Sequence, residues 1–213
     1  MRHVRRMMLI LRQRVALALG AEASRKQRDA QRVAVLRRYL PANAVGAELG
    51  VHKGKFTREL LDALHPAQLH AIDPWYLLGP EWKWDSGDRS TSNALARIIR
   101  NFSDELVSRR LVLHVGFDLA VMKGLADGSF DWVYLDSSHQ YEQTVAELDL
   151  LCSKVKQGGF VAGDDWQSAS THKHHGVCRA VRELVESEGL ELLYASDEDH
   201  QWVARLPGRS AGT

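Results

Sequence analysis

Three aspartates follow two short apolar segments in the second half of the chain. Asp136 comes after residues 132–135, and Asp164 and Asp165 come after residues 160–162. If these segments are neighbouring parallel strands, about 4.8 Å apart, the carboxylates crowd at one edge of a sheet. Such a cluster is costly unless it is protonated, solvated or bridged by a cation, and oxygen ligands favour Mg²⁺ or Mn²⁺. We therefore predict a divalent metal site at Asp136, Asp164 and Asp165; the alternative is that Asp164 or Asp165 only caps the segment that follows.

Histidines close to these aspartates in the sequence are candidates for proton transfer. A metal ion lowers the pKa of an alcohol bound to it, and a general base then accepts the proton. His139, three residues after Asp136, is our first candidate for this base, because imidazole titrates near neutral pH. Tyr141 either orients the base or packs under the next helix, so the predicted catalytic group is Asp136, His139 and Tyr141. Three further histidines form an alternative set of bases: His172, His174 and His175.

A second group of residues surrounds two glycines four positions apart, Gly50 and Gly54. Glycine lets a backbone turn tightly and approach a ligand closely, and this spacing differs from the G-x-G-x-x-G of dinucleotide-binding enzymes. Glu48 would be a poor neighbour for a pyrophosphate and a good one for a ligand that carries an ammonium and a sulfonium group. Asp73, 23 residues after Gly50, is well placed to accept hydrogen bonds from ribose hydroxyls. The alternative is that Glu48 is a surface residue and the glycines only shape a turn.

These residues must be positioned by an α/β sheet, because short apolar runs alternate with helix-period segments from residue 30 onward. We predict a Rossmann-like, mostly parallel seven-stranded sheet with helices on both faces and an antiparallel C-terminal strand pair. Ligands of such sheets bind at the carboxyl ends of the strands. The predicted strands are residues 45–49, 69–72, 111–115, 132–135, 160–162, 190–194 and 201–206, and the predicted helices are residues 26–40, 55–64, 91–106, 118–125, 141–155 and 177–188.

The segment 74–92 is a long connection rich in Gly, Pro, Trp and charged residues, which is typical of a lid or a ligand-binding loop. Its acidic residues Glu81, Asp85 and Asp88 can accept hydrogen bonds from hydroxyl groups, which favours a carbohydrate ligand. Tryptophan faces suit sugar rings or aromatic ligands, although the same side chains can simply cover a pocket. The predicted ligand-binding residues, in this loop and after residue 164, are Trp75, Tyr76, Trp82, Trp84, Trp166 and His174.

The 213 residues suit one domain at 26–208, with a basic N-terminal arm at 1–25 and a short tail at 209–213. Residues 1–40 hold eleven Lys and Arg against two acidic residues, a charge of +9, which leaves −8 for the rest of a chain whose net charge is +1. The arm predicts an amphipathic helix that contacts a second copy in a homodimer or touches a membrane surface through residues 1–20. The alternative is a solvated helix.

Other features narrow the class of protein. The apolar run at residues 9–19 is interrupted by Arg12 and Arg14 and is too short to span a bilayer. The sequence has no aromatic-basic stripe of the kind found on nucleic-acid-binding faces. Cys152 and Cys178 are the only cysteines and have no zinc-binding spacing around them, which suits a reducing cytoplasm. We therefore expect a cytoplasmic protein that acts on a small molecule and binds no nucleic acid.

Four motifs in this order resemble class I S-adenosylmethionine-dependent methyltransferases, most of all the group related to macrocin O-methyltransferase and other sugar or antibiotic O-methyltransferases. The motifs are AELGVHKGKFT, HAIDPW, DWVYLDSSHQYE and KQGGFVAGDDW, and the resemblance covers roughly residues 44–185. The spacing within DSSHQY departs from the pattern usual in macrocin-type enzymes, which bears on the identity of the base.

The resemblance implies both the reaction and the cofactor site. The expected reaction transfers a methyl group from S-adenosylmethionine to a hydroxyl oxygen of a sugar or glycoside, assisted by Mg²⁺ and a histidine base. Alternatives are a phenol or amine methyltransferase of the same fold, with or without a metal, a metal-dependent hydrolase, and a catalytically silent cofactor-binding protein. For Phe117, which the resemblance places beside the adenine, the alternative is packing in the core. The implied cofactor contacts are Glu48, Gly50 and Gly54 for the methionine end, Asp73 for the ribose, Gly116, Phe117 and Asp118 for the adenine, and Asp136 shared with the metal.

Overall fold

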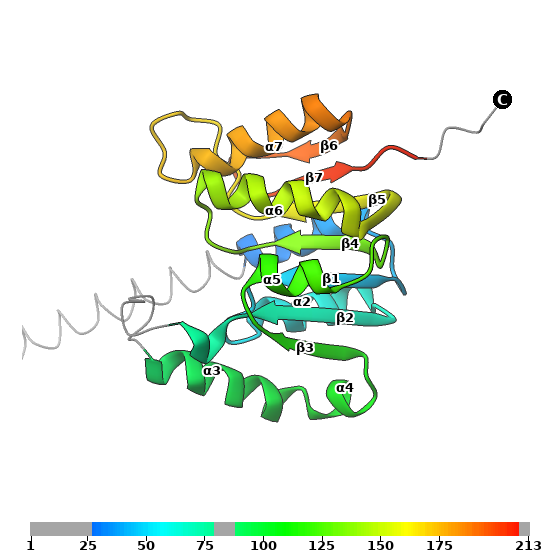
Figure 1. Ribbon diagram of the computed structural model, residues 1–213, viewed down its shortest axis with the longest axis vertical. Coiled ribbons are helices and arrows are strands. Elements are labelled where there is room, and N and C mark those ends of the chain that lie inside the picture. Colours follow the sequence, from blue (N-terminus) through cyan, green and yellow to red (C-terminus); the bar gives the residue numbers. More distant parts are fainter. Residues whose placement is uncertain (1–26, 79–87, 209–213) are drawn as a thin grey trace, which may run out of the picture.

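Seven strands form one mixed sheet in the computed structural model, which describes residues 27–78 and 88–208 (Figure 1). The strand order is β3-β2-β1-β4-β5-β7-β6, in which β1 to β5 pair in parallel and β7 pairs antiparallel with β5 and β6. This confirms the predicted sheet and its antiparallel C-terminal pair. The strands are β1 (Val45–Leu49), β2 (Gln68–Asp73), β3 (Leu111–Val115), β4 (Phe130–Leu135), β5 (Val155–Gly163), β6 (Glu191–Ala195) and β7 (Trp202–Arg205).

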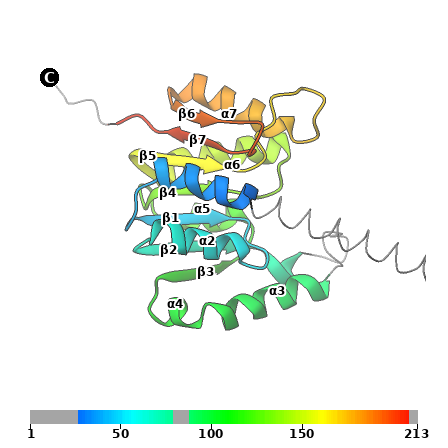
Figure 2. The same cartoon turned by 180° about the vertical axis from the view of Figure 1, so that it is seen from behind.

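Helices cover both faces of this sheet. The face seen in Figure 1 carries α5 (Asp118–Gly124), α6 (Tyr141–Lys154) and α7 (His175–Glu188). The opposite face carries the helical residues 27–39 and α2 (Lys55–Leu64), as Figure 2 shows. The predicted helix 91–106 is instead two helices, α3 (Asp88–Asn101) and α4 (Ser103–Val107), because the backbone of the buried Phe102 leaves the helical conformation at φ −121° and ψ 26°.

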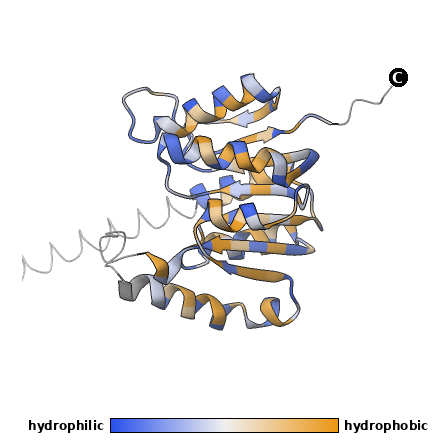
Figure 3. Cartoon of the chain, in the orientation of Figure 1, coloured by the Kyte–Doolittle hydropathy of each residue, from blue (hydrophilic) through white to orange (hydrophobic). Residues whose placement is uncertain are grey.

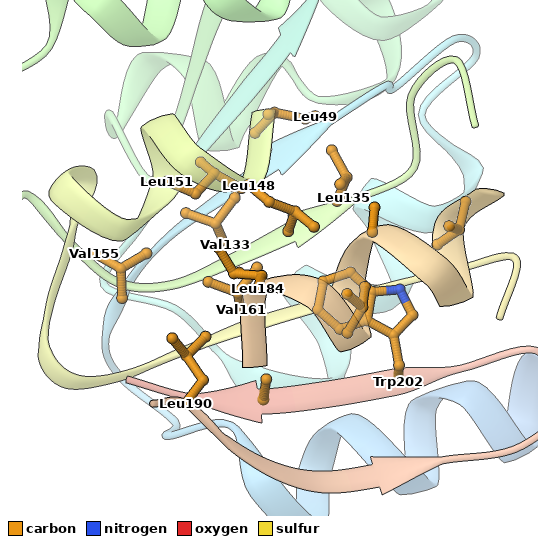
Figure 4. Packing of buried hydrophobic residues seen from close by; sticks show 14 of the residues in the cluster. Leu49, Val133, Leu135, Leu148, Leu151, Val155, Val161, Leu184, Leu190 and Trp202 are labelled. Atoms are coloured by element: carbon orange, nitrogen blue, oxygen red, sulfur yellow. The ribbon is translucent and has the colours of Figure 1, made fainter. Parts of the chain in front are cut away.

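The two faces bury two apolar clusters, one on each side of the sheet. Leu148, Leu151 and Leu184 pack on one face against Val133 and Val161 (Figure 4). The cluster on the other face joins the helices 27–39, α2 and α3 to the same strands. Figure 3 accordingly shows hydrophobic residues along the central strands and hydrophilic ones in the loop 164–174. Strands buried on both faces are continuously apolar, which is why short apolar runs marked them in the sequence.

The order of the strands places a ligand site at a defined edge. The chain winds outward from β1 to β2 and β3, then returns to β4 on the other side of β1. The loops on either side of this reversal diverge, which leaves a crevice at the carboxyl ends of β1 and β4. In Figure 1 this edge faces the loop 164–174 and the short helix η1 (Trp75–Leu77).

Several predictions from sequence fall outside the described residues. These are the basic arm 1–25 with its dimer and membrane contacts, the central part of the loop 74–92 with Glu81, Trp82, Trp84 and Asp85, and the tail 209–213. In the part of the chain that the structure describes, none of the helices combines the length and apolar character that a membrane span requires.

Candidate active site

A tight bend after β1 brings backbone close to the end of β4. Gly50 has φ 86°, its N–H donates to the Ile72 carbonyl over 3.0 Å, and a Cβ built on it would lie 1.9 Å from the carbonyl oxygen of Asp136. Gly54, at φ 72°, ends the bend, and a Cβ there would lie 2.8 Å from the Phe102 ring. The two predicted glycines are therefore required by backbone conformation and by space.

Asp73, at the end of β2, holds this bend in place. Its Oδ2 accepts hydrogen bonds from the N–H groups of Val51 and His52, each over 2.9 Å, and its Oδ1 accepts one from Trp75 N over 2.7 Å. A carboxylate oxygen has two lone pairs, so the two donors fill Oδ2, and Oδ1 retains capacity for one further donor. The predicted ribose contact thus also organises the loop that would surround the ribose.

Glu48 is buried on β1, with 1% of its surface exposed. Its Oε2 accepts a hydrogen bond from the Thr57 hydroxyl over 2.6 Å, while its Oε1 has no hydrogen-bond partner among the described residues. Burial raises the pKa of Glu48 to about 8. A buried carboxylate with an open oxygen is costly unless a ligand completes it, and a cation would restore its charge. The interpretation of Glu48 as a surface residue is therefore wrong.

The turn after β3 forms the other side of the crevice. Phe117 is 54% exposed, so its alternative role in the core is wrong. Asp118 is buried beside Glu147 on α6, and burial together with this neighbouring carboxylate raises the pKa of Asp118. Its Oδ1 has no hydrogen-bond partner within the described ranges. The N–H of Gly116 donates to the Asp73 carbonyl over 3.1 Å, which ties this turn to the end of β2.

Asp136 and Asp164 do meet at the ends of the neighbouring strands β4 and β5, but a guanidinium lies between them. Arg32 Nη2, from the helix 27–39, is 3.3 Å from Asp136 Oδ2 and 3.3 Å from Asp164 Oδ2. The Arg32 side chain is only 8% exposed and lies over the Phe56 ring, 4.0 Å from its centroid. Burial and the nearby Asp164 raise the pKa of Asp136.

The third aspartate points to a pair of histidines. Asp165 Oδ2 lies 3.3 Å from His139 Nδ1 and 2.9 Å from His174 Nδ1, and the other ring nitrogen of His139 lies 3.7 Å from Asp136 Oδ1. His139 and Asp165 have positive φ angles of 57° and 61°. Such strained backbone in residues other than glycine is concentrated at functional sites. Burial lowers the pKa of His174, which favours its neutral form.

The residues present do not fit the predicted ion at Asp136, Asp164 and Asp165. Both oxygens of Asp164 already face donors, because Gln201 Nε2 donates to Oδ1 over 2.6 Å and Arg32 faces Oδ2. Within residues 27–78 and 88–208, the potential metal ligands that gather within 4.8 Å are His139, Asp165 and His174, without Asp136 or Asp164. Of the three carboxylates predicted to share a cation, Asp136 and Asp164 do meet, but their cationic partner in the structure is Arg32, and Asp165 faces the histidines instead.

The predicted ligand-binding aromatics behave differently from one another. Trp75 and Trp166 are buried, at 1% and 4% exposure, so the prediction that they offer open faces is wrong. The Trp75 indole N–H donates to the His52 carbonyl over 2.9 Å, and Arg182 covers the Trp166 ring. Both side chains therefore pack in the interior and offer no open face to a ligand. Tyr76, in contrast, is 56% exposed.

Tyr141 does not orient His139. Its hydroxyl donates to Glu183 on α7 over 2.5 Å, and Arg179 lies over its ring. Hydrogen bonding to Glu183 raises the pKa of Tyr141. Tyr141 thus joins α6 to α7, which corrects its predicted catalytic role in favour of the packing alternative.

Sequence reasoning missed a set of buried polar partners: Arg32, Thr57, Tyr134, Glu147 and Gln201. Thr57 follows the glycine bend by one helical turn, so a search for hydroxyl partners of Glu48 within α2 would have found it. The others come from elements that are distant in sequence, and no local spacing indicates them.

Residues 47–166, more than half of the chain, match the family model described as a methyltransferase domain. A solved protein from Corynebacterium glutamicum has a similar fold, with a TM-score of 0.60 and 15% identity over 85% of this chain and 82% of that one. The N-methyltransferase NodS from Bradyrhizobium japonicum WM9 has a TM-score of 0.57 and 16% identity over 86% of this chain and 96% of that one. Fibrillarin from Aeropyrum pernix, solved with S-adenosyl-L-methionine, has a TM-score of 0.57 and 16% identity over 83% of this chain and 74% of that one. No curated protein matches the sequence.

The matched segment contains both parts of the site. It begins one residue before Glu48 and ends one residue after Asp165, so the glycine bend and the aspartates at the ends of β4 and β5 all lie inside it. The solved structures add the same sheet architecture over most of the chain. The chain therefore belongs to the methyltransferase domain family.

Proposed function

We propose that this protein transfers the methyl group of S-adenosylmethionine to a hydroxyl oxygen of a small molecule, with His139 as the base that accepts the hydroxyl proton. The observation that carries the proposal is the position of His139. Its imidazole lies between the carboxylates of Asp136 and Asp165, at the sheet edge that also holds the glycine bend. This is the arrangement expected of a positioned proton acceptor.

The residues around the bend fit S-adenosylmethionine. Glu48 and Asp118 each have a buried carboxyl oxygen open to a ligand, and the charge of Asp73 acts on both groups. The bend between Gly50 and Gly54 allows close approach of a ligand to the backbone. An exposed ring at Phe117 suits a flat base. We assign the methionine end to Glu48 and the glycine bend, the ribose to Asp73, and the adenine to the turn at 116–118.

When bound, S-adenosylmethionine supplies an electrophilic methyl group on a positively charged sulfur. His139 would hold the acceptor hydroxyl through one ring nitrogen and take its proton, while the methyl carbon exchanges its bond to sulfur for one to the oxygen and the neutral thioether leaves. The imidazolium that results lies near Asp136 and Asp165, whose negative charges stabilise it. The carboxylates thus orient the ring and compensate the charge that it gains. No step is derived through Mg²⁺ or Mn²⁺, because the carboxylates predicted to hold such an ion already have partners within the chain.

A sugar or glycoside is the acceptor that we propose, in line with the resemblance to sugar O-methyltransferases. The segment 81–88 supplies Glu81, Asp85 and Asp88, whose type suits hydroxyl-rich ligands, and Trp82 and Trp84, whose type suits sugar rings. A phenol is the second candidate. The pairing of Arg32 with the aspartates favours it, because a phenolic hydroxyl is acidic enough to be methylated with a base alone.

The test begins with the cofactor and continues with the acceptor. Isothermal titration of the full chain with S-adenosylmethionine is expected to show one site per chain. Mass spectrometry of reactions with a panel of sugars, glycosides, catechols and amines is then expected to show a hydroxyl-bearing product heavier by one methylene. Absence of cofactor binding at high micromolar concentration would refute methyl transfer, and methylation restricted to amines would refute the oxygen acceptor.

A homodimer formed through the arm 1–25, and a cytoplasmic location, are part of the same proposal. Sedimentation of the full chain and of a chain that lacks residues 1–25 tests the first point. Equal sedimentation behaviour after correction for mass would contradict a dimer contact in the arm.

A further inference from the structure

We propose that Arg32 takes the place of a divalent cation between Asp136 and Asp164, so that this methyltransferase works without a metal ion. This inference deepens the proposed function and rests on it for the role of the site in methyl transfer. Arg32 is a positioning residue, since it acts through the aspartates that flank the acceptor site.

Arg32 is part of a closed ring made of three hydrogen bonds and one ion pair. Its Nη2 donates to the Tyr134 hydroxyl over 2.6 Å, and this hydroxyl donates to Gln201 Oε1 over 2.7 Å. The amide nitrogen of Gln201 donates to Asp164 Oδ1 over 2.6 Å. Asp164 Oδ2 forms an ion pair with Arg32 Nη2 at 3.3 Å, which closes the ring. Tyr134 and Gln201 are completely buried. A ring in which the members position one another is far more specific than a chance contact of a surface arginine.

The ring uses the oxygens that a metal ion would need. Each oxygen of Asp164 faces a donor, from Gln201 and from Arg32, and Asp136 Oδ2 also faces Arg32. A magnesium ion that bridged Asp136 and Asp164 would need the position that the guanidinium holds, and the positive charge of Arg32 would repel it. Here the guanidinium itself bridges the two carboxylates. Its charge is permanent, which suits the fixed role of a structural cation.

The site also stabilises the charge of Arg32. Burial alone would lower the pKa of Arg32, but the attraction of Tyr134, Asp164 and Asp136 raises it above its usual value. The guanidinium lies over the Phe56 ring, 4.0 Å from the centroid, and within 5.6 Å of the Tyr134 ring centroid. Stacking on aromatic rings suits arginine better than it suits lysine or a hydrated metal ion. The helix 27–39 therefore contributes a residue to a site that lies over a hundred positions further along the chain.

Titration of the full chain with Mn²⁺, followed by electron paramagnetic resonance of the free ion, tests the inference directly. We expect the wild-type protein, after EDTA treatment and desalting, to leave the signal of free Mn²⁺ unchanged at micromolar concentrations. Arg32→Ala should bind Mn²⁺ at least about tenfold more tightly, because two buried carboxylates lose their cation. Arg38→Ala, which removes an exposed arginine from the same helix, should behave like wild type.

The outcomes separate this inference from the proposed function. Tight Mn²⁺ binding by wild type would overturn it, and loss of that binding in Asp165→Asn would move the ion to the group of His139, Asp165 and His174. Unchanged weak binding in a folded Arg32→Ala would overturn it as well. If Arg32→Ala fails to fold, as judged by circular dichroism, Arg32→Lys is the second variant. It keeps a positive charge and should not gain Mn²⁺ affinity, and a gain would count against the inference. Titration with S-adenosylmethionine in parallel reports on the proposed function, whose failure would leave the Mn²⁺ results unaffected.

Discussion

The two ends of the crevice are built on different principles. Around β1 and β2, the residues that contact one another lie within about one strand-helix-strand unit, and most of the contacts are to backbone groups, as in the bonds from Val51 and His52 to Asp73. Around β4 and β5, side chains from distant elements contact one another. Arg32 and Asp136 are 104 positions apart, and Tyr134 and Gln201 are 67 apart.

These two kinds of construction suit two different tasks, one that is general and one that is specific. In the proposed function, the site made of backbone and glycine binds the constant part of the reaction, the cofactor, and its sequence pattern is correspondingly local. A site made of long-range side-chain contacts can change one partner at a time, such as the cation between two aspartates. Variants of the two ends should therefore fail in different ways, and the first end should be the more sensitive to small changes in volume.

The largest effect is expected for Gly50→Ala at the cofactor end. The added Cβ would lie 1.9 Å from the Asp136 carbonyl oxygen, in a backbone with φ 86°. Relief requires β1 and β4 to separate, so the free energy of unfolding should fall by about 3 kcal/mol or more. Urea denaturation measures this. Gly124→Ala is the control, since a Cβ there meets nothing within 4 Å in the described structure, and its effect should stay within about 1 kcal/mol. Equal stabilities of the two variants would contradict the close packing of the bend.

His139→Ala is expected to give the next largest effect, at the acceptor end. Loss of the proton acceptor should lower turnover at neutral pH by about 10²-fold, with cofactor affinity nearly unchanged. Steady-state kinetics with the best acceptor of the panel, and calorimetry with S-adenosylmethionine, measure the two quantities. His65→Ala, an exposed histidine after α2 and outside both sets of candidate bases, is the control. Full activity of His139→Ala would move the role of the base to the histidines at 172–175.

Glu48→Gln should have a smaller effect, confined to binding. The variant keeps the shape of the side chain and removes the charge that faces a cationic ligand, so affinity for S-adenosylmethionine should fall about tenfold. The loss should be smaller for S-adenosylhomocysteine, which lacks the positive charge on sulfur. Glu186→Gln, on the exposed face of α7, is the control for the loss of one negative charge. Equal losses for both ligands would show that Glu48 contacts only the amino group.

Much of the fold was predictable because most of its strands are apolar along their length. The runs at 45–49 and 111–115 match β1 and β3 in full, and each is apolar for most of its length. β5 was harder to delimit. It begins at Val155, and its first residues include the exposed Lys156 and Gln157, so the apolar run at 160–162 marks only its buried part.

The candidate site also has one part that was predictable from sequence and one part that was not. Glu48, Gly50 and Asp73 were predictable because a glycine spacing and a strand-end acid are visible within 30 residues. Arg32 was not, since the first 40 residues hold ten other Lys and Arg, and only the tertiary contact with Phe56 and the aspartates distinguishes it. Trp75 was misjudged for a similar reason. Its position in a polar loop suggested exposure, but the hydrogen bond to the His52 carbonyl turns the ring inward.

The smallest effect concerns the pH dependence of cofactor binding, and it follows from the burial of Glu48. Without a ligand, burial raises the pKa of Glu48 to about 8, so the group is mostly protonated at neutral pH. A cationic ligand binds the ionised form, and binding below the pKa therefore requires loss of a proton. The affinity for S-adenosylmethionine should rise by at most about tenfold per pH unit until about pH 8. Above that pH it should level off. Calorimetry at several pH values in wild type and in Glu48→Gln isolates this contribution, because titration of the ligand itself is common to both. Parallel pH profiles in the two proteins would mean that Glu48 is already ionised before the cofactor binds, and the open oxygen on β1 would then need another partner.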